Sequence, residues 1–209
     1  LGIIGVVAAI TIPSLIKTYQ EKVTVNKVKK MYSTLNQALK LAINEYGEVS
    51  LWDYGGGSSW TQESAEKFWN YFKTYFKIAR ECKSEENCTI NIMKFLDDET
   101  YEHLPNYDSS TNYKKIILND GSLLWFRTNG EFCQYSDARE SNVCAILCYD
   151  VNGIKKPNTL GKDIFVFQIK SNAVATHPYD DCSLNSNKGG WGCSKYIIKN
   201  GNMNYLHKK

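Results

Sequence analysis

The sequence carries little excess charge and few of the residue patterns from which enzyme active sites are built. Its 25 basic and 22 acidic side chains leave a net charge of +3, too small to indicate a nucleic-acid-binding protein. It has no CxxC pair, which argues against zinc and thioredoxin-like sites, and no glycine-rich phosphate-binding loop. A catalytic Cys–His pair would need His103, His177 or His207, and no local motif supports one. We therefore expect a protein that is not an enzyme.

Cysteine, in contrast, is plentiful. Seven cysteines in 209 residues are many for a cytosolic protein and ordinary for an exported one. They predict three disulfides with one cysteine left over, and the pairings that the spacing favours are Cys82–Cys88, Cys182–Cys193, and Cys133 with either Cys144 or Cys148. We expect these bridges to hold loop-rich regions together in an oxidising compartment.

The first sixteen residues, Leu1–Ile16, carry no charge, and the first charged side chain is Lys17. As a helix this run spans roughly 24 Å, less than the roughly 30 Å hydrocarbon core of a membrane. A signal peptide is the obvious alternative, but Pro13 lies inside the apolar run and the helical pattern continues beyond it. The run therefore has to be buried in lipid or against copies of itself.

Residues 17–46 continue the same helix as an amphipathic one. The apolar positions recur every three or four residues, and they are Val25, Val28, Tyr32, Leu35, Leu39 and Ala42. Gly47 is a plausible end. The sequence thus predicts one helix over 1–46, apolar over residues 1–16 and amphipathic over residues 17–46, followed by a globular region over 47–209.

The segment Gly2–Leu15, GIIGVVAAITIPSL, resembles the end of the N-terminal methylation segment of type IV pilins and type II secretion pseudopilins. Two later segments, Asp150–Phe167 and Gly192–Leu206, are similar to uncharacterised members of the same prepilin-processed group. The resemblance implies a cleavage site and a glutamate upstream of Leu1. It also implies an α+β fold, in which a long N-terminal helix carries a globular domain built on an antiparallel sheet.

The function that this resemblance implies is that of a structural subunit of an extracellular type IV pilus-like filament. The subunit would start as an inner-membrane precursor, use the membrane-bound assembly machinery, form a helical homo-oligomer and require no cofactor. The residues expected in the filament core are Ile3, Val7, Ile10, Ile12 and Pro13. The alternatives are a pseudopilin of a type II secretion system and a membrane-anchored, exported binding module such as an adhesin.

Beyond the long helix, the pattern predicts a second helix and several strands. An apolar stripe from Ala65 to Ala79 indicates a helix that starts at Ser59 or Thr61 and ends near Cys82. A short helix is expected over Ile90–Leu96. The strands expected for a three- or four-stranded antiparallel sheet are Lys114–Leu118, Ser122–Thr128, Glu131–Tyr135, Val143–Val151 and Ile164–Lys170.

The segment between the last two strands is the best candidate ligand site. Asp150, Asn152 and Asp163 offer hard oxygen ligands for Ca²⁺, and the resemblance adds that some pseudopilins bind calcium in a C-terminal loop. The EF-hand spacing is missing, and Lys155 and Lys156 bring positive charge. The alternative is a network of Asx turns, in which the same side chains bind backbone amides.

Overall fold

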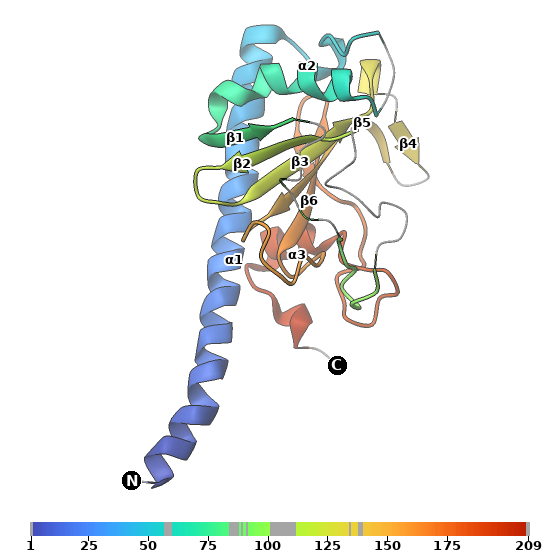
Figure 1. Cartoon of the computed structure of the whole chain (residues 1–209). Helices are drawn as coiled ribbons and strands as arrows, with labels where there is room; N and C mark the ends of the chain where they lie inside the picture. The colour runs from blue at the N-terminus through green and yellow to red at the C-terminus, as the bar shows by residue number, and fades with distance from the viewer. Residues whose placement is uncertain are drawn as a thin grey trace.

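The computed structural model describes residues 2–56, 60–83, 88, 90, 92–100, 112–133, 135–137 and 140–207; among these, side chains are described except those of 2–10, 135–137 and 140. A long N-terminal helix is followed by an antiparallel sheet and a short C-terminal helix, so the fold is α+β (Figure 1). The predicted fold class is confirmed.

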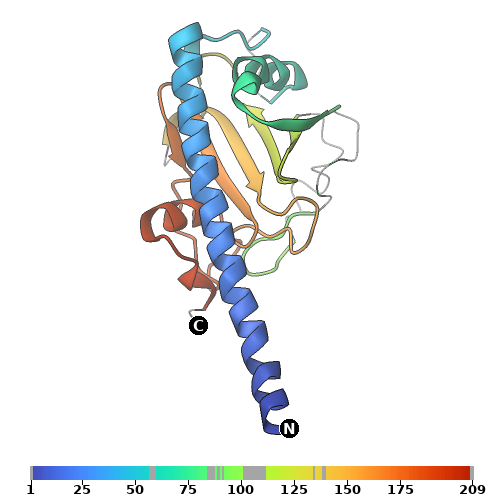
Figure 2. The same cartoon turned by 90° about the vertical axis from the view of Figure 1, so that its left-hand side faces the viewer.

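Helix α1 runs without a break over Gly2–Tyr46, through Pro13. It ends at Gly47, whose positive φ of 82° takes the chain out of the helix while its N–H still donates to the Ile43 carbonyl. The C-terminal half packs on the rest of the protein, whereas the N-terminal portion stands clear of it (Figures 1 and 2). We call the projecting portion, Gly2–Tyr19, the shaft, and the remaining structure the head.

The head is built on a seven-stranded antiparallel sheet of order β1-β2-β3-β5-β6-β7, with β4 paired to β5. The strands are β1 (Ile78–Cys82), β2 (Lys114–Leu118), β3 (Leu123–Thr128), β4 (Tyr135–Asp137), β5 (Glu140–Asp150), β6 (Ile164–Lys170) and β7 (Val174–Thr176). Four of the five predicted strands are therefore present within a few residues of their expected ends. The sheet is larger than the three or four strands expected, because β1, β4 and β7 also join it.

Two cores cover the two faces of the sheet. On one face, α1, α2 (Gln62–Phe72) and α3 (Cys193–Asn200) pack on side chains such as Phe126, Leu147 and Phe167. On the other face, Met93, Phe95 and Leu160 pack on strand residues that include Trp125 and Val166. The sheet is thus buried on both sides, which explains why β6 is apolar at nearly every position rather than at alternate ones.

The second helix is shorter than predicted. Thr61, one of the two residues predicted as the start of the helix, is its N-cap. The Thr61 hydroxyl oxygen accepts a hydrogen bond from the Ser64 amide over 3.1 Å. However, α2 ends at Phe72, a single 3-10 turn follows, and the residues expected to complete the helix form β1. The prediction was wrong there because pairing of β1 with β2 and the bridge from Cys82 outweigh the local helical pattern.

Two other expectations also differ from the structure. None of the described residues of 90–96 is helical, because Lys94 exchanges backbone hydrogen bonds with Asn158 and Leu160 instead. The strand expected at Glu131–Tyr135 is a 3-10 turn up to Cys133, where Phe132 and Cys133 have positive φ angles, and β4 begins only at Tyr135. Helix α3 and strand β7 were not predicted.

The disulfide pattern agrees with the prediction and resolves its one alternative. The bridges are Cys82–Cys88, Cys133–Cys144 and Cys182–Cys193. Cys148 is the free cysteine; it is buried, and burial raises the pKa of its thiol to about 12, so it is held in the unreactive protonated form. Three bridges indicate an oxidising, extracytoplasmic location.

Candidate functional site

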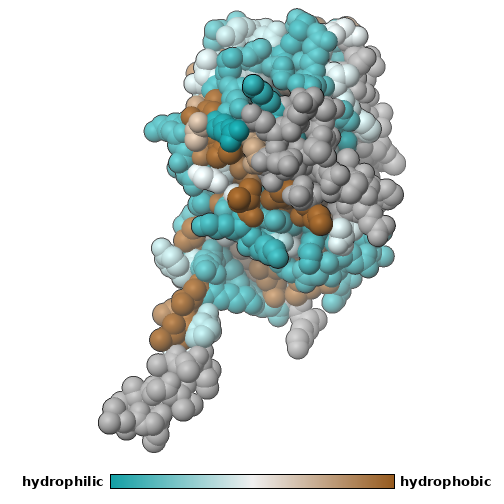
Figure 3. Space-filling view, viewed as in Figure 1, coloured by the Kyte–Doolittle hydropathy of each residue, from teal (hydrophilic) through white to brown (hydrophobic). Residues whose placement is uncertain are grey.

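The shaft exposes a stripe of apolar side chains. Four of them lie on one side of α1 at spacings of three, one and three residues, and their exposed fractions are 53% for Ile12, 70% for Leu15, 50% for Ile16 and 66% for Tyr19. Figure 3 shows this apolar surface on the shaft, next to the head. An exposed stripe of this size is costly in water, which indicates a surface that another molecule covers.

Ile12 and Pro13, two of the residues expected in a filament core, lie on this exposed portion of α1. The other three, Ile3, Val7 and Ile10, belong to the helix, but their side chains lie outside the described ones. Within the described portion of the chain, no helix combines the length and the apolar character needed to span a membrane.

The predicted ligand residues Asp150, Asn152 and Asp163 are brought together in the loop that joins β5 to β6, here called the Asp150 loop (Asp150–Asp163). The Asp150 carboxylate accepts a hydrogen bond from the Asn152 amide over 3.0 Å. The Asn152 side-chain amide donates to Asp163 over 3.2 Å. Asp163 also accepts from the Thr159 and Asn158 amides over 2.6 and 2.8 Å. The expected Asx-turn contacts are therefore present.

These contacts leave three other side-chain oxygen atoms of the loop without a hydrogen bond among the described residues. Asp150 Oδ2, Asn152 Oδ1 and Asn158 Oδ1 are buried, and none has a hydrogen-bond partner in the described structure. Burial, followed by the charge of Asp163, raises the pKa of Asp150 from its ordinary 3.8 to about 8. Burial likewise raises the pKa of Asp163. Two buried carboxyl groups and spare oxygens are an environment that a cation would stabilise.

The loop supplies only part of the set of oxygen ligands that Ca²⁺ takes. Ca²⁺ takes six to eight oxygen ligands, including carboxylates, side-chain amides, carbonyls and water. The loop offers three unpartnered oxygens from Asp150, Asn152 and Asn158, with Asp163 beside them. No group of three or more His, Cys, Asp or Glu side chains suited to a metal occurs among the described residues. A bound cation would therefore depend on amide oxygens and water, and calcium stays a prediction.

A groove of about 590 Å³ lies between α1, the Asp150 loop and the C-terminal residues Met203 and Leu206. The loop is held against α1 because the Lys27 ammonium group donates to the Val151 carbonyl over 2.6 Å. On the other side of the groove, the carboxylate oxygen Oε2 of Glu21 in α1 lies 2.9 Å from the ring nitrogen Nε2 of His207. The sequence did not reveal this groove, since nothing in the spacing shows which side of α1 the loop lies on.

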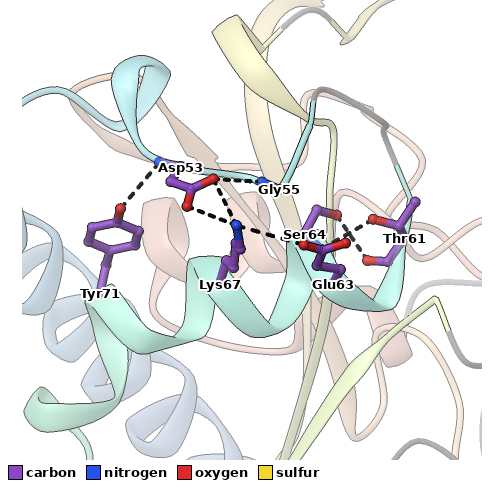
Figure 4. Close-up of polar contacts among 7 residues, drawn as sticks. All are labelled: Asp53, Gly55, Thr61, Glu63, Ser64, Lys67 and Tyr71. Atoms are coloured by element: carbon purple, nitrogen blue, oxygen red, sulfur yellow. Dashed lines mark hydrogen bonds and ion pairs between the residues drawn. The ribbon is translucent and has the colours of Figure 1, made fainter.

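A polar network at the opposite end of the head connects α2 to the preceding loop (Figure 4). Asp53 accepts hydrogen bonds from Lys67 over 2.9 Å and from the Gly55 amide over 2.8 Å, and its own amide donates to the Tyr71 hydroxyl. The bond from Lys67 holds the pKa of Asp53 below its usual range. All polar members have a partner inside the network, so it fixes the loop on α2 and offers no free reactive group.

The chain belongs to DUF6613, a family of unknown function, whose model matches residues 14–209. No curated protein and no solved structure matches the chain. The match covers the head together with the upper end of the shaft, from Ser14 onward.

Proposed function

We propose that this chain is the structural subunit of an extracellular, type IV pilus-like filament, held together by the apolar N-terminal portion of α1. The observation that carries the proposal is the shaft, on which Ile12, Leu15, Ile16 and Tyr19 are each half or more exposed. Burying one such side chain fully stabilises a protein by about 1.5–3 kcal/mol. Covering the stripe is therefore a strong reason for copies of the chain to associate.

A neighbouring copy suits this stripe better than the chain's own head. The apolar side chains lie on the side of α1 away from the residues that pack on the sheet, such as Val28, Leu35 and Leu39. The head therefore cannot cover Ile12, Leu15 and Ile16 without releasing α1. Side-by-side packing of parallel shafts buries the stripe. When the stripe of one copy packs on a different face of the next shaft, the contact is heterologous, and its repetition gives an open helical assembly when the rotation does not close.

The remaining observations fit a subunit that works outside the cell. The three disulfides suit an exported protein, and the N-terminal segment resembles that of pilins and pseudopilins. In this proposal the precursor enters the filament from the inner membrane through an assembly machinery. The head faces outward and needs no cofactor, and calcium in the Asp150 loop would add rigidity.

Electron microscopy of the purified full chain tests the proposal. Detergent-solubilised protein is dialysed to remove detergent and examined by negative staining. Filaments of regular width with the heads outside are expected. Monomers that stay bound to added lipid vesicles would instead support a membrane-anchored binding module. Short, regular filaments that form only together with a secretion apparatus would support a pseudopilin.

A further inference from the structure

The groove beside α1 gathers positive charge that nothing in the described structure neutralises. Lys17 from α1 and Lys155 and Lys156 from the Asp150 loop line it together, and none of their ammonium groups has a hydrogen-bond or ion-pair partner among the described residues. The other lysines of the groove are engaged, because Lys27 donates to Val151 and Lys162 pairs with Asp98 over 2.8 Å. We call Lys17, Lys155 and Lys156 the lysine cluster.

Each carboxylate that lines the same groove has a partner outside the lysine cluster, and Glu21 Oε1 is left without a hydrogen-bond partner among the described residues. Glu21 contacts His207, and Asp163 accepts hydrogen bonds from the amides of Thr159 and Asn158. Neither carboxylate forms an ion pair with a member of the lysine cluster. Tyr19, at the upper end of the apolar stripe, also lines the groove, as does the partly exposed Val23. The groove therefore offers both positive charge and apolar surface, at the end of the head from which the shaft projects.

The far end of α1 has the opposite character. Glu45 lies in its last turn and Glu48 two residues after its end, both exposed, and that turn contains no basic residue. Acidic side chains are unfavourable there, because the unsatisfied carbonyls already give the C-terminal end of a helix a partial negative charge. Tyr46 and Leu51 add exposed apolar surface, with exposed fractions of 43% and 71%. We call Glu45 and Glu48 the acidic end.

We infer that the lysine cluster of one copy docks on the acidic end of α1 of a second copy. This inference rests on the proposed function, and it names a contact by which heads join along the filament. Charge and apolar surface match on both sides: Lys155 and Lys156 meet Glu45 and Glu48, with Tyr19 of one copy near Leu51 of the other.

The geometry sets how far apart the two copies lie. Along α1, Lys17 and Glu45 are separated by about 42 Å at 1.5 Å per residue, so the docked copies are displaced by about that distance along the shaft direction. The patches lie on different regions of the surface, so docking leaves a free lysine cluster at one end and a free acidic end at the other. Such a contact does not close on itself and can continue indefinitely.

Charge reversal in the full-length chain tests the contact. The base variant carries Lys155→Glu and Lys156→Glu, and the end variant carries Glu45→Lys and Glu48→Lys. Each variant alone should assemble at least tenfold less than the unchanged chain, measured as pelletable filament. An equal mixture of the two should recover assembly, because each then meets a partner of opposite charge. A chain that carries all four changes should also assemble.

The matched control carries Lys77→Glu and Lys199→Glu. Both lysines are exposed and lie outside the groove, and replacing them changes the net charge by the same amount as in the base variant. This control should assemble as the unchanged chain does. Assembly by either variant alone, or failure of folded variants to recover on mixing, would overturn the contact. So would a base variant that assembles normally but loses affinity for phosphatidylglycerol vesicles, since the lysines would then serve lipid. If the unchanged chain forms no filament, the proposed function itself fails.

Discussion

The ammonium group of Lys27, in the middle of α1, donates a hydrogen bond to the carbonyl oxygen of Val151 over 2.6 Å. It thereby joins the long helix to the first residue after β5. The same lysine lowers the pKa of Asp150, one residue earlier in the chain, against the larger effects of burial and of Asp163. One side chain therefore joins the Asp150 loop to α1 and, as a minor contribution, favours the ionised form of Asp150.

Replacing Lys27 by methionine keeps the apolar stem and removes the donor. A hydrogen bond from a charged group contributes about 1.5–3 kcal/mol, so we expect Lys27→Met to lower the free energy of unfolding by about that amount. Urea denaturation followed by fluorescence measures it. Lys22→Met, at an exposed position of α1, is the control and should change stability by less than about 0.5 kcal/mol. Equal losses in the two variants would contradict the role of the Val151 contact.

The buried Asp150 predicts that the protein loses stability as the pH rises. Because the folded pKa of about 8 lies above the ordinary 3.8, the folded state holds a proton that the unfolded state has released. Stability from this group is fully present below about pH 4 and is lost as the pH rises through about 8. Thermal melts between about pH 5 and pH 8, with chelator present, should show a falling Tm.

Asp150→Asn should flatten that dependence, because asparagine keeps the shape and stays neutral. Asp180→Asn is the control: Asp180 is exposed, and its hydrogen bond from Lys195 lowers its pKa, so it is ionised throughout the interval. It should keep the slope of the unchanged protein. A slope that persists in Asp150→Asn would assign the pH dependence to another group.

Calcium bound in the Asp150 loop should offset the loss of thermal stability that the ionisation of Asp150 causes at rising pH. A cation bound only by the folded state raises stability by about 2.7 kcal/mol at a hundredfold excess over its dissociation constant. The melt is repeated at about pH 7.5 with calcium and with chelator, for the unchanged chain and for Asp163→Ala. An upward shift with calcium that disappears in Asp163→Ala supports the metal. Identical curves in the unchanged chain would leave the Asx-turn contacts as the whole role of the loop.

The pairing of the cysteines leads to a direct chemical test. Mass spectrometry without reduction should show three bridges and one thiol, and peptide mapping should join Cys133 to Cys144 rather than to Cys148. Cys148 should resist alkylation until the protein is unfolded, because it is buried and its thiol pKa is about 12. Reduction should cost about 2–4 kcal/mol for each bridge. Seven alkylated cysteines in the exported protein, unfolded without reductant, would contradict an oxidising location.

The elements of the fold that the sequence predicted are those decided by local periodicity. Residues 1–46 follow one helical pattern, β2 ends in an apolar run that leads into the turn signal at Asn119–Gly121, and β6 is apolar at nearly every position. The predictions of secondary structure were wrong where contacts with residues elsewhere in the chain determine the structure. Strand β1 has a helical pattern but pairs with β2, and α3 is anchored in a glycine- and asparagine-rich segment by Cys193, bridged to Cys182.

The candidate sites divide in the same way. Asp150, Asn152 and Asp163 are close in sequence, so their meeting in one loop could be predicted. The groove could not, because Lys17 and Lys155 are far apart in the chain and meet only once the sheet places the Asp150 loop beside α1. Periodicity showed which positions of α1 are apolar but not which side of α1 the Asp150 loop would lie on.

The apolar stripe on the shaft is the surface that the proposed filament buries. Leu15 is 70% exposed, in the middle of the stripe, so Leu15→Asp should cost the isolated chain little stability. In the filament the new carboxylate would be buried without a partner, at a cost of several kcal/mol for each contact, and assembly should be abolished. Ser14→Asp places the same charge outside the stripe, about 100° around α1 from Leu15, and should affect assembly less. Pelleting and electron microscopy measure assembly, and the thermal melt verifies that both heads are folded. Filaments from Leu15→Asp at the normal yield would show that the stripe is not the assembly surface.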